Sequence, residues 1–197
     1  MAETIETRPF PPFLPKKATV MMMGTFPPEQ SKRAMEFHYP NFQNDMWRVF
    51  GLVFFDEKDH FRNGEEKAMD SEKIKAFLSE TGIASCPTVL KAIREKRNAS
   101  DAFLKVVEPV PLADVLEQIP DCKHIGTTGG KATEILLSLL PEKVKLPKTG
   151  ETIPFVFNGR ELTLTRLPST SRAYPLSLAK KAEAYKNFFK ACGLKTK

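Results

Sequence analysis

The sequence has few cysteines, and its histidines and cysteines form none of the common metal-binding patterns. The three cysteines are far apart and odd in number, which argues against a disulfide framework and favours a reducing compartment. Three thiolates also cannot supply the four ligands of an iron–sulfur cluster. The three histidines lack the His-x-x-x-His spacing, and no Cys-x-x-Cys pair accompanies them. We therefore expect no metal and no organic cofactor.

Long apolar runs and an export signal are missing as well. No stretch approaches the roughly 18 apolar residues that a membrane helix needs. Residues 1–6 are acidic and lack the basic-then-apolar order of a signal peptide. Hydrophobic residues make up 41% of the chain and charged residues 27%, as in an ordinary soluble protein. We expect a cytoplasmic monomer with no membrane partner.

Length, proline content and charge set the domain organisation and the class of partner. A chain of 197 residues fits one domain, 1–197, that can bury a core without metals or disulfides. Within the N-terminal arm, 1–17, the segment Arg8–Pro15 is too proline-rich for a helix or a central strand, so we expect it to be extended and held by its phenylalanines. The net charge of +6 favours a polyanionic partner.

Hydrophobic periodicity predicts strands that alternate with helices. The predicted strands are 16–23, 83–86, 122–127 and a hairpin over 153–166 around Asn158-Gly159. The predicted helices are 44–54, 69–81 with a cap at Asp70 or Ser71 and a stop at Gly82, 111–119, 130–140 and 174–192. The charged stretch 94–101 is predicted as a loop, with a helix or turn up to Val107. This order predicts a three-layer α/β/α sandwich with a short, central, mostly parallel sheet.

Polar and small residues follow each predicted parallel strand. These residues are Gly24-Thr25-Phe26, Ser85-Cys86, Thr127-Thr128-Gly129 and Ser169-Thr170-Ser171. Because open α/β sheets bind ligands at the carboxyl ends of their strands, we expect these segments to border one site. The segment His38–Trp47 adds the flat ring of Tyr39, the amide of Asn44 and an apolar indole. Such groups suit a planar ligand with a polar edge.

These motifs, in this order, resemble the uracil-DNA glycosylase superfamily, especially its mismatch-specific thymine/uracil branch and its hypoxanthine-directed branch. The matching segments are Gly24–Pro27, His38–Trp47 and the Pro-Ser loop Leu167–Arg172, and the likeness spans about 18–192. The resemblance implies a monofunctional enzyme of base-excision repair. It would hydrolyse the N-glycosidic bond of a uracil, a thymine in G·T or a hypoxanthine flipped out of DNA, without a nucleophilic side chain.

The resemblance also implies roles for individual residues. Tyr39, with Phe37 as the second choice, would stack on the base. The base would be bordered by Phe26, Ser85 and Thr128. Asn44 and Thr25 occupy positions that the resemblance implies are catalytic. One departure is Phe26, since the uracil-directed and mismatch-directed branches carry Asp or Asn there to orient water. The hypoxanthine-directed branch lacks that group and uses an Asn at the place of Asn44. Alternatively, Asn44 caps the helix that begins near Asp45.

A second set of residues is implied to hold DNA backbone. Ser169, Thr170 and Ser171 would clamp phosphates, Arg172 would contact phosphate or enter the vacated stack, and Lys131 would add a phosphate contact. The alternative for the serine loop is a plain helix entry. Ser85 is followed by Cys86-Pro87 instead of the Trp-Asp or Tyr-Asp of relatives, which leaves the identity of the base open.

Two rival functions follow from the same residues. Phe26 favours a catalytically degenerate protein that binds damaged DNA or another nucleic acid without cutting it. The loop Gly126–Ala132 suggests a nucleotide-binding enzyme, but it lacks the first Gly and the final Ser or Thr of a P-loop. The segment 94–101 resembles a polar loop of the hypoxanthine-directed branch, or it is a solvated charged loop.

The charge predicts a strong salt dependence of DNA binding. Because phosphate contacts release condensed counterions, the affinity for duplex DNA should fall at least tenfold when salt rises from about 50 to about 200 mM. Fluorescence anisotropy with a labelled duplex measures this directly. An affinity that does not change with salt contradicts DNA as the partner.

Overall fold

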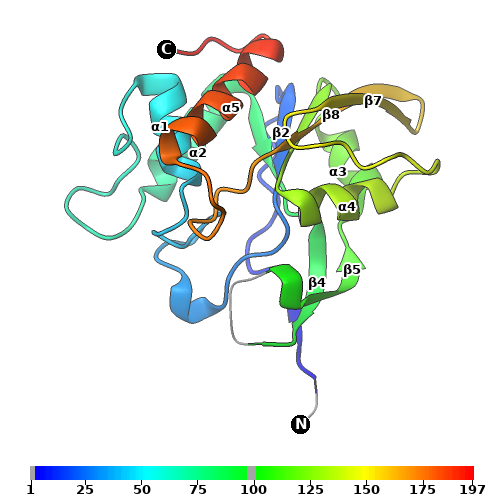
Figure 1. Ribbon diagram of the computed structural model, residues 1–197, viewed down its shortest axis with the longest axis horizontal. Helices are drawn as coiled ribbons and strands as arrows, with labels where there is room; N and C mark the ends of the chain where they lie inside the picture. Colours follow the sequence, from blue (N-terminus) through cyan, green and yellow to red (C-terminus); the bar gives the residue numbers. More distant parts are fainter. Residues whose placement is uncertain (1–2, 97–100) are drawn as a thin grey trace.

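A five-stranded sheet forms the centre of the computed structural model, which describes residues 3–96 and 101–197 (Figure 1). Its strands are β2 (Val20–Met23), β3 (Ile83–Ser85), β6 (His124–Thr128), β7 (Thr152–Phe157) and β8 (Arg160–Leu167). They lie in the order β3-β2-β6-β8-β7. The first four are parallel, and β7 runs antiparallel to β8. The predicted mostly parallel sheet is confirmed.

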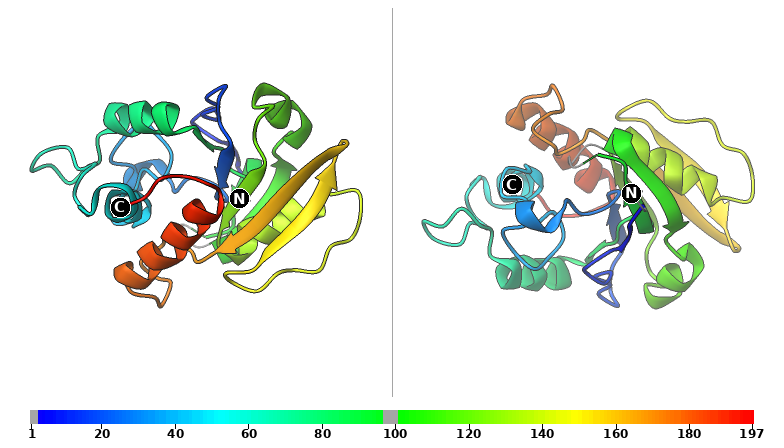
Figure 2. Two further views of the ribbon diagram at one scale, coloured as in Figure 1. Left: turned by 90° about the horizontal axis from the view of Figure 1, so that it is seen from above. Right: turned by 90° about the horizontal axis from the view of Figure 1, so that it is seen from below.

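Helices cover both faces of this sheet (Figure 2). The helices α1 (Met46–Phe55), α2 (Ser71–Thr81) and α5 (Leu178–Ala191) pack on one face, and α3 (Leu112–Gln118) and α4 (Gly130–Ser138) pack on the other. Strand β2 shows why both layers are needed. Its alternating residues Val20 and Met22 enter the first core, while Met21 and Met23 enter the second. A strand buried on both faces has no polar side, so it reads as a continuous apolar run. The three-layer α/β/α prediction is confirmed.

Local sequence signals account for several element ends. The Asp70 side chain accepts from Lys73 N at 3.1 Å and caps α2, and Gly82 ends it in the left-handed region with φ 78°. The turn between β7 and β8 places Asn158 at φ 48° and Gly159 at φ 77°, as a tight hairpin requires. These caps and this hairpin lie where the sequence predicts them.

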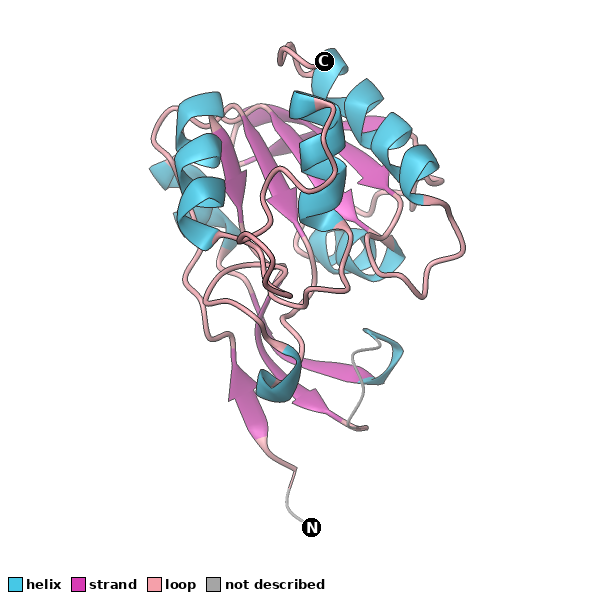
Figure 3. Cartoon of the chain, turned by 90° about the vertical axis from the view of Figure 1, so that its left-hand side faces the viewer, coloured by secondary structure: helices cyan, strands magenta, loops and turns pink. Residues whose placement is uncertain are grey.

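A small antiparallel sheet corrects the prediction for residues 94–107. It joins β1 (Ile5–Thr7), β4 (Val89–Arg94) and β5 (Leu104–Pro109) in the order β1-β4-β5. Figure 3 shows it below the main sheet, on the side of the N-terminus. The predicted helix or turn up to Val107 is wrong, since the short 3₁₀ helix Asp101–Phe103 is followed directly by β5. Strand β1 lies far from β4 in sequence, and β4 carries register shifts against its neighbour β5 that break its alternation, so local periodicity could not reveal the sheet. Residues 97–100 of the predicted loop lie outside the described residues.

Other bounds differ by a few residues. The strand expected from Lys16 begins at Val20, and the helix expected from Tyr174 begins at Leu178, where the Ser177 hydroxyl accepts from Lys180 N at 3.3 Å. A further 3₁₀ helix covers Gln30–Lys32. Over the described ranges, no helix is both long and apolar enough to cross a bilayer.

The N-terminal arm lies against the edge of the main sheet. Phe10 is buried, and Phe13 exchanges two backbone hydrogen bonds with Ser85, each of 2.9 Å. The segment therefore adds a bridge beside β3 instead of crossing the surface freely.

Close packing between the sheet and α5 predicts an effect of Gly126→Ala. A Cβ at this position would lie 2.9 Å from the ring of Phe188 and 3.0 Å from Leu167. The substitution should lower the free energy of unfolding by about 1–3 kcal/mol, measured by urea denaturation. Phe188→Leu, which removes the ring, should cost less in the Gly126→Ala background than alone, since the two residues touch. Simple additivity would contradict this packing.

Candidate functional site

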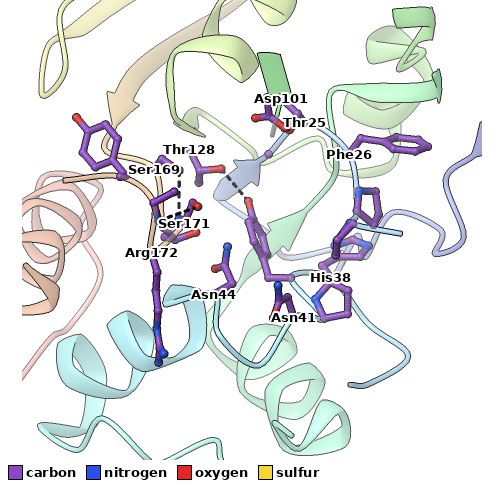
Figure 4. A pocket seen from close by; sticks show the side chains of 18 of the residues that line it. Thr25, Phe26, His38, Asn41, Asn44, Asp101, Thr128, Ser169, Ser171 and Arg172 are labelled. Carbon is purple, nitrogen blue, oxygen red and sulfur yellow. Dashed lines mark hydrogen bonds between the residues drawn. The ribbon is translucent and has the colours of Figure 1, made fainter. Parts of the chain in front are cut away.

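A cavity of about 650 Å³ opens at the carboxyl ends of the parallel strands (Figure 4). The segments predicted to follow β2, β3, β6 and β8 all reach it, together with the loop before α1. Its lining includes Gly24, Thr25, Phe26, His38, Tyr39, Asn44, Ser85, Asp101, Thr128, Ser169, Thr170, Ser171 and Arg172. Of the residues assigned a role from the sequence, Lys131, Trp47 and the second-choice Phe37 do not belong to the lining.

Tyr39 lies across the end of β2. Its backbone has φ 53°, its hydroxyl is hydrogen-bonded to Thr128 Oγ1 at 3.0 Å, and its ring meets Trp47 edge-on at 6.1 Å. A Cβ on Gly24 would lie 2.7 Å from the Tyr39 hydroxyl, so only glycine permits this close approach. Burial raises the pKa of the Tyr39 phenol, which therefore stays neutral. The ring is thus held as a fixed wall of the cavity.

The two phenylalanines named from the sequence are used in packing. Phe37 is 4% exposed and stacks on the His38 ring at 4.7 Å, which places it in the core. Phe26 packs against the cluster formed by the small sheet, and the Arg94 guanidinium lies 5.5 Å from its ring. Figure 4 shows the Phe26 ring turned away from the polar groups of the cavity. Phe26 borders the cavity mainly through its place after β2.

The side-chain oxygen of Asn44 already accepts a hydrogen bond from the protein. Its Oδ1 accepts from Met46 N, the first amide of α1, at 2.9 Å, so the capping contact considered from the sequence is present. Figure 4 shows the amide nitrogen directed toward the cavity. The side chain is therefore oriented by the helix and presents hydrogen-bond donors to a ligand.

Asp101 supplies a carboxylate that the sequence analysis did not single out. Its Oδ1 accepts from Thr25 Oγ1 at 2.7 Å. Burial raises the pKa of Asp101, against the lowering effects of the Thr25 hydrogen bond and of the charges of Lys131 and Arg94. Phe26 occupies the expected place of the acid, and Asp101 reaches the neighbouring Thr25 from another part of the chain. Its only sequence signal was membership of the charged stretch 94–101.

Ser85 and His38 form a buried pair at another side of the cavity. Each is 3% exposed, and Ser85 Oγ lies 2.6 Å from His38 Nδ1. His38 Nε2 lies 2.9 Å from the carbonyl oxygen of Pro11 in the N-terminal arm. Desolvation lowers the pKa of His38 to about 4, although the hydrogen bond to Pro11 acts in the opposite direction. His38 is therefore neutral at physiological pH.

The serine loop after β8 is held by a buried carboxylate at the start of α1. The Asp45 backbone N–H donates to Thr170 O at 2.9 Å, and Asp45 Oδ2 accepts from Lys181 Nζ at 3.2 Å. Lys181, which is 1% exposed, also donates to Ser171 O at 2.9 Å. Arg172 Nε lies 3.4 Å from Asp45 Oδ1 with about half of its side chain exposed. The sequence analysis missed Asp45 and Lys181, although a lysine on the apolar stripe of α5 was a usable signal.

Lys131 lies in the first turn of α4, behind the end of β6. It is outside the cavity lining, and it acts on the cavity through the effect of its charge on Asp101. The residues with described positions contain no group of three or more His, Cys, Asp or Glu side chains placed to hold a metal ion.

Comparison with known proteins supports the architecture. No family model and no curated protein matches the sequence. A solution NMR structure from Methanosarcina acetivorans, of a protein described as a candidate uracil DNA glycosylase, matches with a TM-score of 0.64 and 20% identity over 96% of this chain and 99% of the other. The chain has a uracil-DNA glycosylase-like fold. The resemblance to the uracil-DNA glycosylase superfamily is thus supported at the level of the fold alone, and neither branch is singled out.

The Asp45–Lys181 contact predicts a specific loss of stability. Lys181→Met would leave the buried Asp45 carboxylate with weaker partners, so the free energy of unfolding should fall by about 3 kcal/mol. Lys180→Met, at the exposed neighbouring position, should change it by less than about 0.5 kcal/mol. Equal effects of the two substitutions in urea denaturation would contradict the anchoring role of Lys181.

Proposed function

We propose that the protein is a monofunctional DNA glycosylase that hydrolyses the N-glycosidic bond of a deaminated or mismatched base flipped out of DNA. The observation that carries this proposal is the convergence of Asn44 and the Thr25–Asp101 pair on a single cavity at the carboxyl ends of the parallel strands. The uracil-DNA glycosylase-like fold adds support. Uracil, thymine in G·T and hypoxanthine are the candidate bases.

The cavity offers a group for each requirement of this reaction. The Tyr39 ring and Thr128 provide a wall for a planar base. The amide NH₂ of Asn44 is placed to donate to a base carbonyl, where negative charge develops as the base departs. Asp101 holds a carboxylate beside Thr25 that can take a proton from the attacking water. Asn44 is thus proposed to stabilise the leaving base, and Asp101 to activate water.

The chemistry of the lining favours direct hydrolysis. Among the described residues that line the cavity there is no lysine, so the lining offers no amine to form a Schiff base with the sugar. A lining without such an amine agrees with hydrolysis by water, which a monofunctional glycosylase uses.

DNA would approach along the serine loop. Ser169, Ser171 and Arg172 lie at the cavity border, where hydroxyls, backbone N–H groups and a half-exposed guanidinium can contact phosphates. The Asp45–Lys181 pair beneath them keeps this loop in place before DNA arrives. Preorganisation of this kind lowers the cost of flipping the base.

The second candidate is a binder without glycosylase activity. Phe26 favours it, because this ring packs against the small sheet and cannot orient water.

A glycosylase assay separates the two functions. Duplexes with one uracil, hypoxanthine, xanthine or G·T mismatch are incubated with protein and then cleaved by alkali. Strand cleavage at one lesion supports the enzyme and names its base, whereas tight binding without cleavage supports the binder.

Two substitutions test the proposed catalytic groups. Asn44→Ala and Asp101→Asn should each lower the single-turnover rate by at least about 100-fold while DNA binding persists. Asp114→Asn, an exposed acid on α3, is the matched control and should keep the wild-type rate. Wild-type rates in Asn44→Ala or Asp101→Asn would refute the corresponding assignment.

The raised pKa of Asp101 adds a pH dependence with a definite sign. Only the ionised carboxylate accepts a proton, so the rate should fall with decreasing pH, starting above the pH at which an ordinary aspartate, with a pKa of about 3.9, is protonated. The folded state binds this proton more tightly than the unfolded state, so the ionised carboxylate costs stability at neutral pH. Asp101→Asn should therefore lose activity without losing stability, which thermal unfolding at neutral pH measures.

A further inference from the structure

The position of the proton between Ser85 and His38 follows from the contacts of His38. The carbonyl oxygen of Pro11 can only accept a hydrogen bond, so His38 Nε2, at 2.9 Å, must carry a proton and donate it. His38 is neutral, because burial lowers its pKa to about 4. A neutral imidazole has one N–H, so Nδ1 is a bare acceptor. The Ser85 hydroxyl, at 2.6 Å, therefore donates its proton to Nδ1.

In this arrangement the Ser85 oxygen can only accept a hydrogen bond from a ligand in the cavity. Its proton is committed to the histidine ring, so only its lone pairs remain for a ligand. The His38 ring is held by stacking on Phe37, with the ring centroids 4.7 Å apart and an interplanar angle of 2°. The backbone of Ser85 is held as well, by its two hydrogen bonds with Phe13. Ser85 is therefore a fixed acceptor, whereas an ordinary serine can rotate its hydroxyl to donate or accept.

We propose that Ser85, set as an acceptor by His38 and the Pro11 carbonyl, reads the ring N–H of a lactam in the flipped base. This inference rests on the proposed glycosylase function and adds a basis for substrate choice. Uracil, thymine and hypoxanthine all carry an N–H beside a ring carbonyl, whereas cytosine and adenine carry a bare ring nitrogen beside an amino group. An acceptor opposite that bare nitrogen leaves two lone pairs facing each other, which is penalised in a buried site.

Asn44 completes the match on the other half of the lactam. Its oxygen is held by Met46 N, so its NH₂ is the group offered to the cavity. One fixed acceptor and one fixed donor fit an N–H and its neighbouring carbonyl. In cytosine and adenine the same two groups would meet a bare ring nitrogen and an amino group, so acceptor would face acceptor and donor would face donor. Deamination would thus be read as the reversal of a donor–acceptor pattern.

Base analogues test the reading of the N–H. Duplexes carry uracil or hypoxanthine on a 2′-fluoroarabino sugar that resists cleavage, or the corresponding 3-deaza or 1-deaza base. In the deaza bases a C–H replaces the N–H and the neighbouring carbonyl is present as its enol, whose oxygen can still accept from Asn44, with little change of shape. Wild-type protein should bind the lactam duplex about tenfold more tightly than its deaza counterpart by fluorescence anisotropy. Ser85→Ala should reduce this ratio to near one, and Ser79→Ala, at an exposed position of α2, should preserve it.

The positioning role of His38 needs a measurement that does not depend on activity. Long-range ¹H–¹⁵N spectra of the ¹⁵N-labelled protein near neutral pH distinguish the protonated ring nitrogen from the bare one. We expect Nε2 protonated and Nδ1 bare. His38→Phe keeps a ring for stacking, frees the Ser85 hydroxyl and should lower the lactam-to-deaza ratio. Adding Ser85→Ala to that variant should change the ratio less than Ser85→Ala changes it in the wild type.

The outcomes separate this inference from the function on which it rests. A proton on Nδ1, or an unchanged ratio in Ser85→Ala alongside tight lactam binding, overturns the role of Ser85 and leaves the glycosylase proposal intact. Failure of every lesion duplex to bind better than unmodified DNA overturns the glycosylase proposal and the base reading with it. The inference is supported if His38 carries its proton on Nε2 and if Ser85→Ala loses the lactam-to-deaza binding ratio.

Discussion

The buried contact between Asp45 and Lys181 joins the parts of the chain from which the cavity is built. Asp45 begins α1, its amide holds Thr170, and Lys181 reaches from α5 to both Asp45 and the carbonyl of Ser171. A buried charge is costly unless it is paired and hydrogen-bonded. The first helix, the last helix and the serine loop must therefore come together in one arrangement. The positions of the serine loop and Arg172, which are proposed to contact DNA, depend on this arrangement.

Three of the polar side chains that line the cavity share a second property. Each already has a protein partner that uses part of its hydrogen-bonding capacity: Asn44 is held by Met46 N, Thr25 by Asp101, and Ser85 by His38. What each group has left to offer is therefore fixed before a ligand binds. Sites of this kind need little reorganisation during a reaction, which is the condition for strong electrostatic stabilisation of a transition state. Their selectivity lies as much in the supporting contacts as in the residues that touch the ligand.

Sequence patterns predicted those parts of the fold that depend on nearby residues. The run Val20–Met23, the Asp70 cap and the Asn158-Gly159 turn each carry their signal within a few positions, and the structure has them where expected. The small sheet was missed because β1 pairs with the distant β4, and because register shifts break the alternation of β4 against β5. Asp101 and Lys181 were missed for the same reason, since their partners Thr25 and Asp45 lie 76 and 136 positions away. For the site, the sequence predicted which segments gather at the strand ends, whereas the proton positions required the structure.

The contact of the Pro11 carbonyl with His38 has a consequence for folding. The cavity combines a segment near position 11 with the loop before α1, the end of β3 and a serine loop anchored by α5. Contacts between such distant segments form late, because the chain between them must first be ordered. On a ribosome, the cavity cannot close until α5 has emerged, long after the strands β2 and β3 exist as chain. A partly folded or partly made molecule therefore lacks the complete pocket, so binding of the proposed base would mark a completely folded chain.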